Sequence, residues 1–253
     1  MEKSFGEKIG YGSFGQVYVN NEDPSTCVKV TNKDNDVNFC RKWSNEFEKI
    51  ASILTHLEPL KSYKKLEMVR IIKPVEFNET NTICFMKIPR IFRPKLEHET
   101  KYEYDKKQFI TLQAQLGHKD VSMTHKGRGE FIGIKQIREY MEDDDLDIAC
   151  FELGVTMGLI HYNGRNDGLD IEVFLGKEYR SKKCRFYIAD FDMTSRIETY
   201  DALTIEKMYH SLDDIPYFPR KNVNRKMFDL FKNGYYSCVP FEIADKVFTE
   251  YEK

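Results

Sequence analysis

Three glycines near the start of the chain have the spacing of a loop that binds phosphate groups. Gly10, Gly12, Gly15 and Val17 fit the pattern G-x-G-x-x-G-x-V. Glycines let the backbone approach a phosphate closely and direct its N–H groups at the oxygen atoms. The pattern alone is a weak signal, because a plain hairpin also uses glycines where the backbone needs a positive φ angle.

The residues that follow distinguish between two phosphate-binding architectures that share this pattern. A dinucleotide-binding loop continues directly into a helix whose N-terminus faces the pyrophosphate. Here residues 17–19 are β-branched and aromatic and lead into a polar turn at 20–25, so we expect strand, turn and strand instead. Such a hairpin is typical of proteins in which it covers the phosphates of ATP.

A lysine on the next expected strand, residues 26–30, strengthens this interpretation. In a site of this kind the lysine binds the α- and β-phosphates and is held by a glutamate of a helix. Lys29 fits the first role, and residues 37–57, which have helical periodicity, supply Glu46 and Glu48 for the second. We favour Glu46, because apolar residues follow it one and two turns later. The alternative is that Lys29 is an ordinary exposed strand lysine.

Acidic residues in the second half have the spacing of a proton acceptor and metal ligands. Asp167 lies five residues before Glu172, and Asp190 follows the strand expected at 185–189. We predict that Asp167 accepts the proton of an acceptor hydroxyl, and that Glu172 and Asp190 bind Mg²⁺, which prefers oxygen ligands. Asp170 is the nearest alternative proton acceptor. Acidic loop residues are commonly only solvated, so the prediction depends on all the motifs occurring in the expected order along the chain.

Several positions differ from those of an efficient phosphotransfer site. Leu169 stands where a cation would stabilise the transferring phosphate, and Arg165 could replace that cation only by folding into the site. Asp192 stands where a glycine is expected after Asp190. Because transfer depends on positioning and charge neutralisation, the sequence predicts nucleotide binding with weak transfer.

These motifs together resemble the protein-kinase-like superfamily. The second half is also similar to a fungal kinase-like family of unknown function that is catalogued as a zinc-finger-protein domain. This similarity covers about residues 110–236 and is carried by residues 158–161, 167–176, 187–192, 214–220 and 231–235. It implies a kinase-like C-lobe and names no substrate. The clustered cysteine and histidine ligands of a zinc site do not occur in the sequence.

The expected fold class is α+β, with a two-lobed protein-kinase-like fold in a single domain. We expect a small, mostly-β N-lobe at residues 1–90 and a larger helical C-lobe at residues 91–253. Further strands are expected at 69–75, 82–88, 172–175 and 185–191, an exposed loop at 119–130 and an apolar helix at 146–161.

The amino-acid composition of the chain limits the kinds of partner that we expect it to bind. The net charge of −2 gives no field that would attract nucleic acid or an anionic membrane, and no apolar run is long enough to span a bilayer. The six cysteines are scattered, so we expect reduced thiols and a cytoplasmic or nuclear protein.

Two functions fit these residues. The first is a kinase-like protein that binds ATP and Mg²⁺, either an atypical kinase or a pseudokinase. The alternative is a non-enzymatic kinase-fold scaffold or interaction module that has lost nucleotide binding. The expected partners are a nucleotide and, as a second candidate, another protein.

Overall fold

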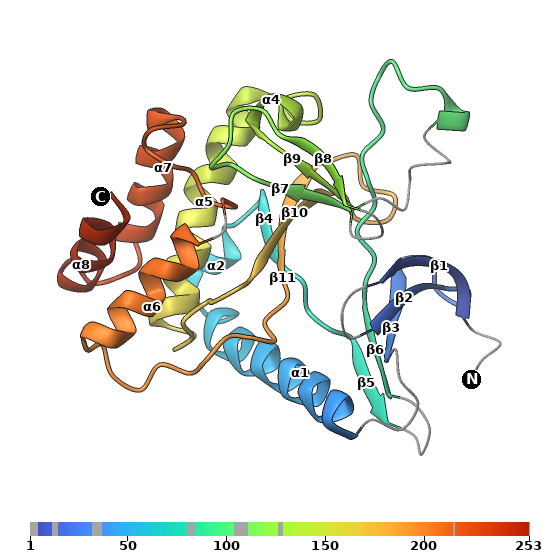
Figure 1. Cartoon of the computed structure of the whole chain (residues 1–253), viewed down its shortest axis with the longest axis horizontal. Helices are drawn as coiled ribbons and strands as arrows, with labels where there is room; N and C mark the ends of the chain where they lie inside the picture. Colours follow the sequence, from blue (N-terminus) through green and yellow to red (C-terminus); the bar gives the residue numbers. More distant parts are fainter. Residues whose placement is uncertain are drawn as a thin grey trace.

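The strands of the chain form two separate sheets in a computed structural model that describes residues 5–11, 15–31, 37–79, 84–103, 111–125, 129–214 and 216–252. In Figure 1 the N-terminal sheet lies at one end of the molecule and the C-terminal helices at the other, with the second sheet between them. The chain therefore has the expected α+β class, with a five-stranded antiparallel sheet first and most helices after it.

The first sheet has the order β1-β2-β3-β6-β5. Its strands are β1 (Phe5–Tyr11), β2 (Gly15–Asn20), β3 (Thr26–Thr31), β5 (Glu76–Glu79) and β6 (Cys84–Pro89). The expected hairpin is present, because β1 pairs antiparallel with β2, but Gly12 lies outside the described residues. Val17 pairs with Lys29, and Lys29 pairs with Met86, so these three side chains project from the same face.

The second sheet is mixed and has the order β4-β11-β10-β7-β9-β8. Its strands are β4 (Val69–Ile71), β7 (Leu112–Ala114), β8 (Ser122–His125), β9 (Gly129–Ile132), β10 (Glu172–Gly176) and β11 (Arg185–Ala189). The antiparallel pair β10–β11 confirms the hairpin expected in the second half.

Two sequence-based expectations about strands were wrong. The segment at 69–75 was expected as an N-lobe strand, but only β4 forms there, and it pairs in parallel with β11 of the second sheet. The segment at 119–130 was expected to be an exposed loop, but it contains β8 and the beginning of β9, which pair antiparallel with each other. Its polar composition is compatible with a strand because β8 lies at the edge of the sheet.

The expected helix at residues 37–57 is confirmed as α1 (Val37–Leu57), and it links the two sheets. Near its beginning, Cys40 and Trp43 are buried in a small cluster with Cys84 of β6. Its last turns contribute four apolar side chains to the large core of the C-terminal part: Ile50, Ile53, Leu54 and Leu57. In Figure 1 this helix runs along the lower edge, from the first sheet toward the C-terminal helices.

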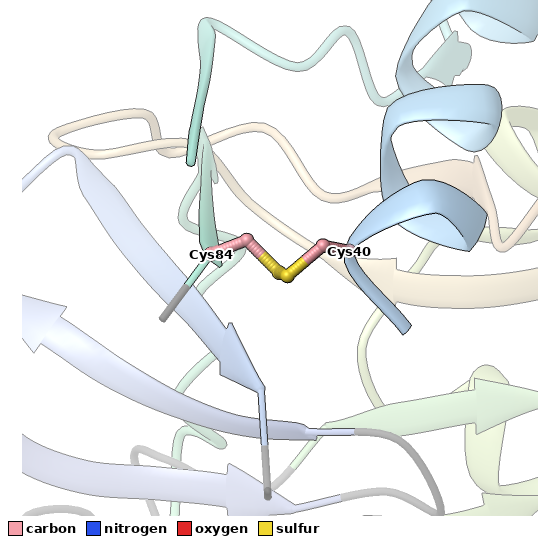
Figure 2. The surroundings of a disulfide bond; sticks show 2 residues. All are labelled: Cys40 and Cys84. Carbon is pink, nitrogen blue, oxygen red and sulfur yellow. A yellow bond between two sulfur atoms is a disulfide. The ribbon is translucent and has the colours of Figure 1, made fainter. Parts of the chain in front are cut away.

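Cys40 and Cys84 form a disulfide, which corrects the expectation that all six cysteines are reduced. Figure 2 shows the bond between α1 and β6. The sequence could not reveal this pair, because 44 residues separate cysteines whose Cα atoms lie 5.6 Å apart. The other four cysteines are free. A structural disulfide is uncommon in a reducing compartment, and the cytoplasmic or nuclear location expected from the sequence stays a prediction.

The C-terminal part is mainly helical, and α5 (Asp143–Tyr162) lies at its centre. The other helices are α2 (Lys61–Lys64), α4 (Ile134–Ile137), α6 (Ala202–Asp213), α7 (Arg225–Tyr236) and α8 (Phe241–Tyr251). A Cβ atom on Gly154 of α5 would lie 1.9 Å from the Phe231 carbonyl oxygen, so α5 and α7 approach closely only with glycine there. None of the described helices is long and apolar enough to cross a membrane.

Candidate functional site

Lys29 and Glu46 form an ion pair between the first sheet and α1. The Lys29 Nζ atom lies 3.4 Å from the Glu46 Oε2 atom, and the Glu46 side chain is only 4% exposed. Burial opposes the charged form of Lys29, but the carboxylates of Glu46, Asp190 and Asp192 outweigh it and keep the pKa of Lys29 above its ordinary value. The structure thus brings Lys29 together with the helix glutamate that the sequence favoured.

Trp43 packs directly beneath this ion pair and explains one of the predicted glycines. The Lys29 Nζ atom lies 5.1 Å from the centre of the buried Trp43 ring. A Cβ atom on Gly15 would lie 2.5 Å from that ring, so the residue must be glycine for the hairpin to pack against α1. A Cβ atom on Gly10 would meet Val17 only at ordinary contact distance, so packing alone does not require that glycine.

Two further lysines of α1 hold the segment that begins at Asp190. Lys42 Nζ lies 2.5 Å from the Asp192 Oδ2 atom. Lys49 Nζ donates hydrogen bonds to the carbonyl oxygens of Asp192, at 3.0 Å, and Thr194, at 2.6 Å. Asp192, which departs from the expected glycine, therefore has a structural partner in this chain.

Asp167 is buried, and its carboxylate already accepts hydrogen bonds. Its Oδ1 atom accepts from the Ser195 backbone N–H at 2.8 Å and from the Leu169 N–H at 3.2 Å. The side chain is 2% exposed. The first contact connects the loop to Ser195, as do the backbone hydrogen bonds from Asp167 N–H to the Ser195 carbonyl oxygen and from Ile197 N–H to the Arg165 carbonyl oxygen, so Asp167 has a role in holding the loop. Its predicted role as proton acceptor stays a prediction.

Asp170 lies on the same loop but is exposed and close to the other carboxylates. Partial removal of its carboxyl from water and the charge of Asp192 raise the pKa of Asp170, whereas Lys42 lowers it. Its φ angle is 62°, in the left-handed region, as is that of Asp190 at 64°. Such backbone is uncommon for residues other than glycine, although aspartate adopts it more readily than most.

Arg165 does not fold into the site. Its guanidinium lies 5.2 Å from the centre of the Tyr200 ring, and its Nη1 atom donates to the Glu198 carbonyl oxygen at 3.4 Å. The condition under which Arg165 could replace the missing cation at Leu169 is therefore not met.

Glu172 and Asp190 come from neighbouring elements, since β10 begins at Glu172 and Asp190 directly follows β11. The hydroxyl of the buried Tyr217 is hydrogen-bonded to the Glu172 carboxylate and orients it. Among the described residues, no group of three or more His, Cys, Asp and Glu side chains is arranged to hold a metal ion. A pair of carboxylates is nevertheless a common protein contribution to Mg²⁺, because nucleotide phosphates and water provide the other ligands.

Asp190 carries a charge that its surroundings disfavour. Burial and the carboxylates of Glu46, Asp192 and Asp170 raise the pKa of Asp190 to about 6, although Lys29 acts in the opposite direction. A divalent cation at this position would relieve the repulsion between these carboxylates. Oxygen ligands of this kind suit Mg²⁺, and the assignment of Asp190 and Glu172 as the two residues that hold it stays a prediction.

Three residues with direct contacts in the site were missed in the sequence: Lys42, Lys49 and Tyr217. The lysines lie four residues before and three residues after Glu46, so helical spacing alone could have placed all three on one face. Tyr217 lies in the segment 214–220 that carries the resemblance, but it is far from Glu172 in the sequence and no spacing connected the two residues.

Comparison with known proteins adds no identification. No family model matches the sequence, and no curated protein matches it.

Proposed function

We propose that the protein is a kinase-like protein that binds ATP together with Mg²⁺ and transfers phosphate slowly. The observation that carries this proposal is the Lys29–Glu46 ion pair, which is in electrostatic contact with Asp190. Lys29 comes from the sheet, Glu46 from α1 and Asp190 from the end of β11, so three separate elements converge. A lysine held in this way is suited to bind phosphate oxygens, and the adjacent carboxylates to bind their metal ion.

The weak-transfer part of the proposal rests on Leu169 and Arg165. Neither supplies a positive charge to the transferring phosphate, because one is apolar and the other stacks on Tyr200. Removing one stabilising group of this kind typically costs about 10²–10³ in rate without preventing substrate binding.

A non-enzymatic scaffold is the second candidate, and the Lys42–Asp192 ion pair favours it. This contact ties the segment after Asp190 to α1, so Asp192 has a structural role that does not require a nucleotide.

A thermal-shift experiment separates the two candidates. Saturating Mg-ATP, at a hundred times Kd, is expected to stabilise the protein by about 2.7 kcal/mol. Lys29→Ala should lose most of this gain. Lys87→Ala is the matched control, since Lys87 pairs with Glu76 on the same sheet but projects from the opposite face. If wild-type protein shows no shift, nucleotide binding is rejected and the scaffold is favoured.

A further inference from the structure

A groove of about 570 Å³ lies among α2, α5 and α7 and shares no residue with the proposed nucleotide site. We refer to it as the α5 groove, because α5 contributes most of its apolar lining. This lining consists of Leu66, which follows α2, of Ile148, Phe151 and Val155 on α5, and of Leu230 on α7. The volume is within the range of pockets that bind ligands.

Two apolar side chains of α5 are exposed in this groove, on a helix that is otherwise buried. Ile148 is 48% exposed and Phe151 is 37% exposed, whereas every other residue at positions 149–161 is buried. Together with Val155 they occupy positions i, i+3 and i+7, so they form one apolar stripe along the helix. An exposed apolar stripe inside a groove is typical of a surface that another molecule covers.

The backbone that carries Phe151 is fixed by the close approach of α5 and α7. A Cβ atom on Gly234 of α7 would lie 2.0 Å from the Phe151 carbonyl oxygen, so the two helices are in contact at this point. The side chain of Phe151 remains exposed although its backbone is packed. The groove is therefore a preformed feature of the helix packing, and a ligand can bind there with little rearrangement of the chain.

The carboxylates that border the groove are already engaged. Asp147 pairs with Lys226, and Asp144 on the first turn of α5 acts electrostatically on the same lysine. The buried Glu152 accepts hydrogen bonds from the backbone N–H groups of residues 67–69. These carboxylates therefore leave little negative charge to attract a cation to the groove.

The opposite holds for the lysines beside α2. Three of them are exposed and have no ion pair with any described residue: Lys61, Lys64 and Lys65. The acidic residues closest to them in the sequence, Glu58 and Glu67, pair instead with Lys73 and Lys183. Since Lys65 itself lines the groove, one wall carries a positive charge that the chain does not compensate.

We propose that the α5 groove binds an acidic amphipathic helix of a partner protein. Apolar side chains of that helix pack on Ile148, Phe151 and Val155, and its carboxylates face the lysines beside α2. Each residue of the lining lies on a helix or directly after one, so the groove presents no strand edge with which an extended peptide could pair. A concave apolar floor also fits a helix better than it fits a flat membrane surface.

Two matched peptides test this assignment. Both are held helical by the same side-chain crosslink and carry leucine at positions i, i+3 and i+7. One carries glutamates beside this stripe, and the other carries glutamines at the same positions. Binding of each peptide to the full chain is followed by fluorescence anisotropy. The glutamate peptide should bind about fivefold more tightly, which is the effect of one ion pair at an exposed site.

Variants of the chain connect this preference to the groove. Lys65→Glu should remove the preference for glutamate, whereas Lys246→Glu, which changes an exposed lysine of α8, should keep it. Phe151→Ala should weaken the binding of both peptides about tenfold, because it removes an apolar contact. Leu203→Ala, which changes an exposed leucine of α6, should leave the affinity of both peptides unchanged.

The melting temperature and Mg-ATP binding are measured on the same samples, and Ile148→Ala replaces Phe151→Ala if that variant is misfolded. No binding of the glutamate peptide, equal affinity for both peptides, or binding that does not change when the stripe is truncated overturns the proposal. Self-association of the wild type that Phe151→Ala abolishes also overturns it, because a second copy would then occupy the groove. Mg-ATP binding should be the same in the wild type and these variants, so the proposed function is tested separately.

Discussion

Asp190 combines three features that each cost stability. Its side chain is half-buried, its backbone is left-handed with a φ angle of 64°, and three other carboxylates act on it. A fold under selection for stability alone would not need an ionised group here, so we interpret Asp190 as a residue retained for a ligand.

The pH dependence of stability tests this interpretation in the protein without ligands. The pKa of Asp190 is raised to about 6 in the folded state, above its ordinary value of 3.8. The folded state therefore binds this proton more tightly than the unfolded state, and stability falls as pH rises from about 4 through 6. Asp190→Asn should be more stable than wild type at pH 8, by on the order of 1 kcal/mol, and should lose this advantage at pH 4. Denaturant unfolding at the two pH values measures this, and an equal difference at both would contradict it.

Asp167 and Asp170 are the two candidates for the residue that accepts the proton of the acceptor hydroxyl. Asp167 has its carboxylate engaged by two backbone N–H groups, whereas Asp170 is exposed beside the acidic cluster. Turnover of ATP should be slow, below the ~1–100 per second of ordinary kinases. If Asp167 is the acceptor, Asp167→Asn abolishes turnover and Asp170→Asn does not. Activity that survives Asp167→Asn but not Asp170→Asn would reassign the role, provided both variants bind ATP.

At the scale of elements, α1 connects most of the site. Cys40 ties its first turns to β6, Glu46 pairs with Lys29, and Lys42 and Lys49 hold the segment after β11. The position of this helix therefore sets the distance between Lys29, the proposed phosphate-binding residue, and the carboxylates that we propose to bind the metal.

Reduction of the disulfide should destabilise the fold and loosen this helix. Closing a loop of 44 residues is expected to contribute about 3–4 kcal/mol. A dithiol reductant should therefore lower the free energy of unfolding of the wild type and also weaken Mg-ATP binding, because Glu46 follows Cys40 by less than two turns. In Cys84→Ser the reductant should have no further effect. A wild type whose unfolding does not respond to the reductant would show that the bond does not form in solution.

The sequence predicted those elements whose signal is local. The periodicity of residues 37–57 gave α1, and the apolar run at 146–161 gave most of α5. The pairing of β4 with β11 and the strand β8 could not be predicted, because they depend on partners distant in the sequence and on polar edge residues. The same holds within the site, where Lys29 and Glu46 followed from motif and helix spacing but Tyr217 and the Asp167 hydrogen bonds did not.

At the scale of the whole molecule, elements from before the expected lobe boundary at residue 90 pack with elements that follow it. β4 and the last turns of α1 lie in the first 90 residues, but they belong to the second sheet and to the larger core. The buried Glu152 of α5 reinforces this by accepting hydrogen bonds from the backbone N–H groups of residues 67–69. The two parts are thus joined by shared core elements, and the site forms where they meet.

Titration calorimetry of ATP with and without Mg²⁺ tests the central claim most directly. Glu172 and Asp190 repel metal-free phosphates and attract a divalent cation, so we predict that the wild type binds ATP with Mg²⁺ and much more weakly without it. Glu172→Gln should reduce this dependence on Mg²⁺, because it removes one of the two charges. Equal affinity in both conditions, or no binding in either, would contradict a nucleotide and metal site at Lys29, Glu172 and Asp190.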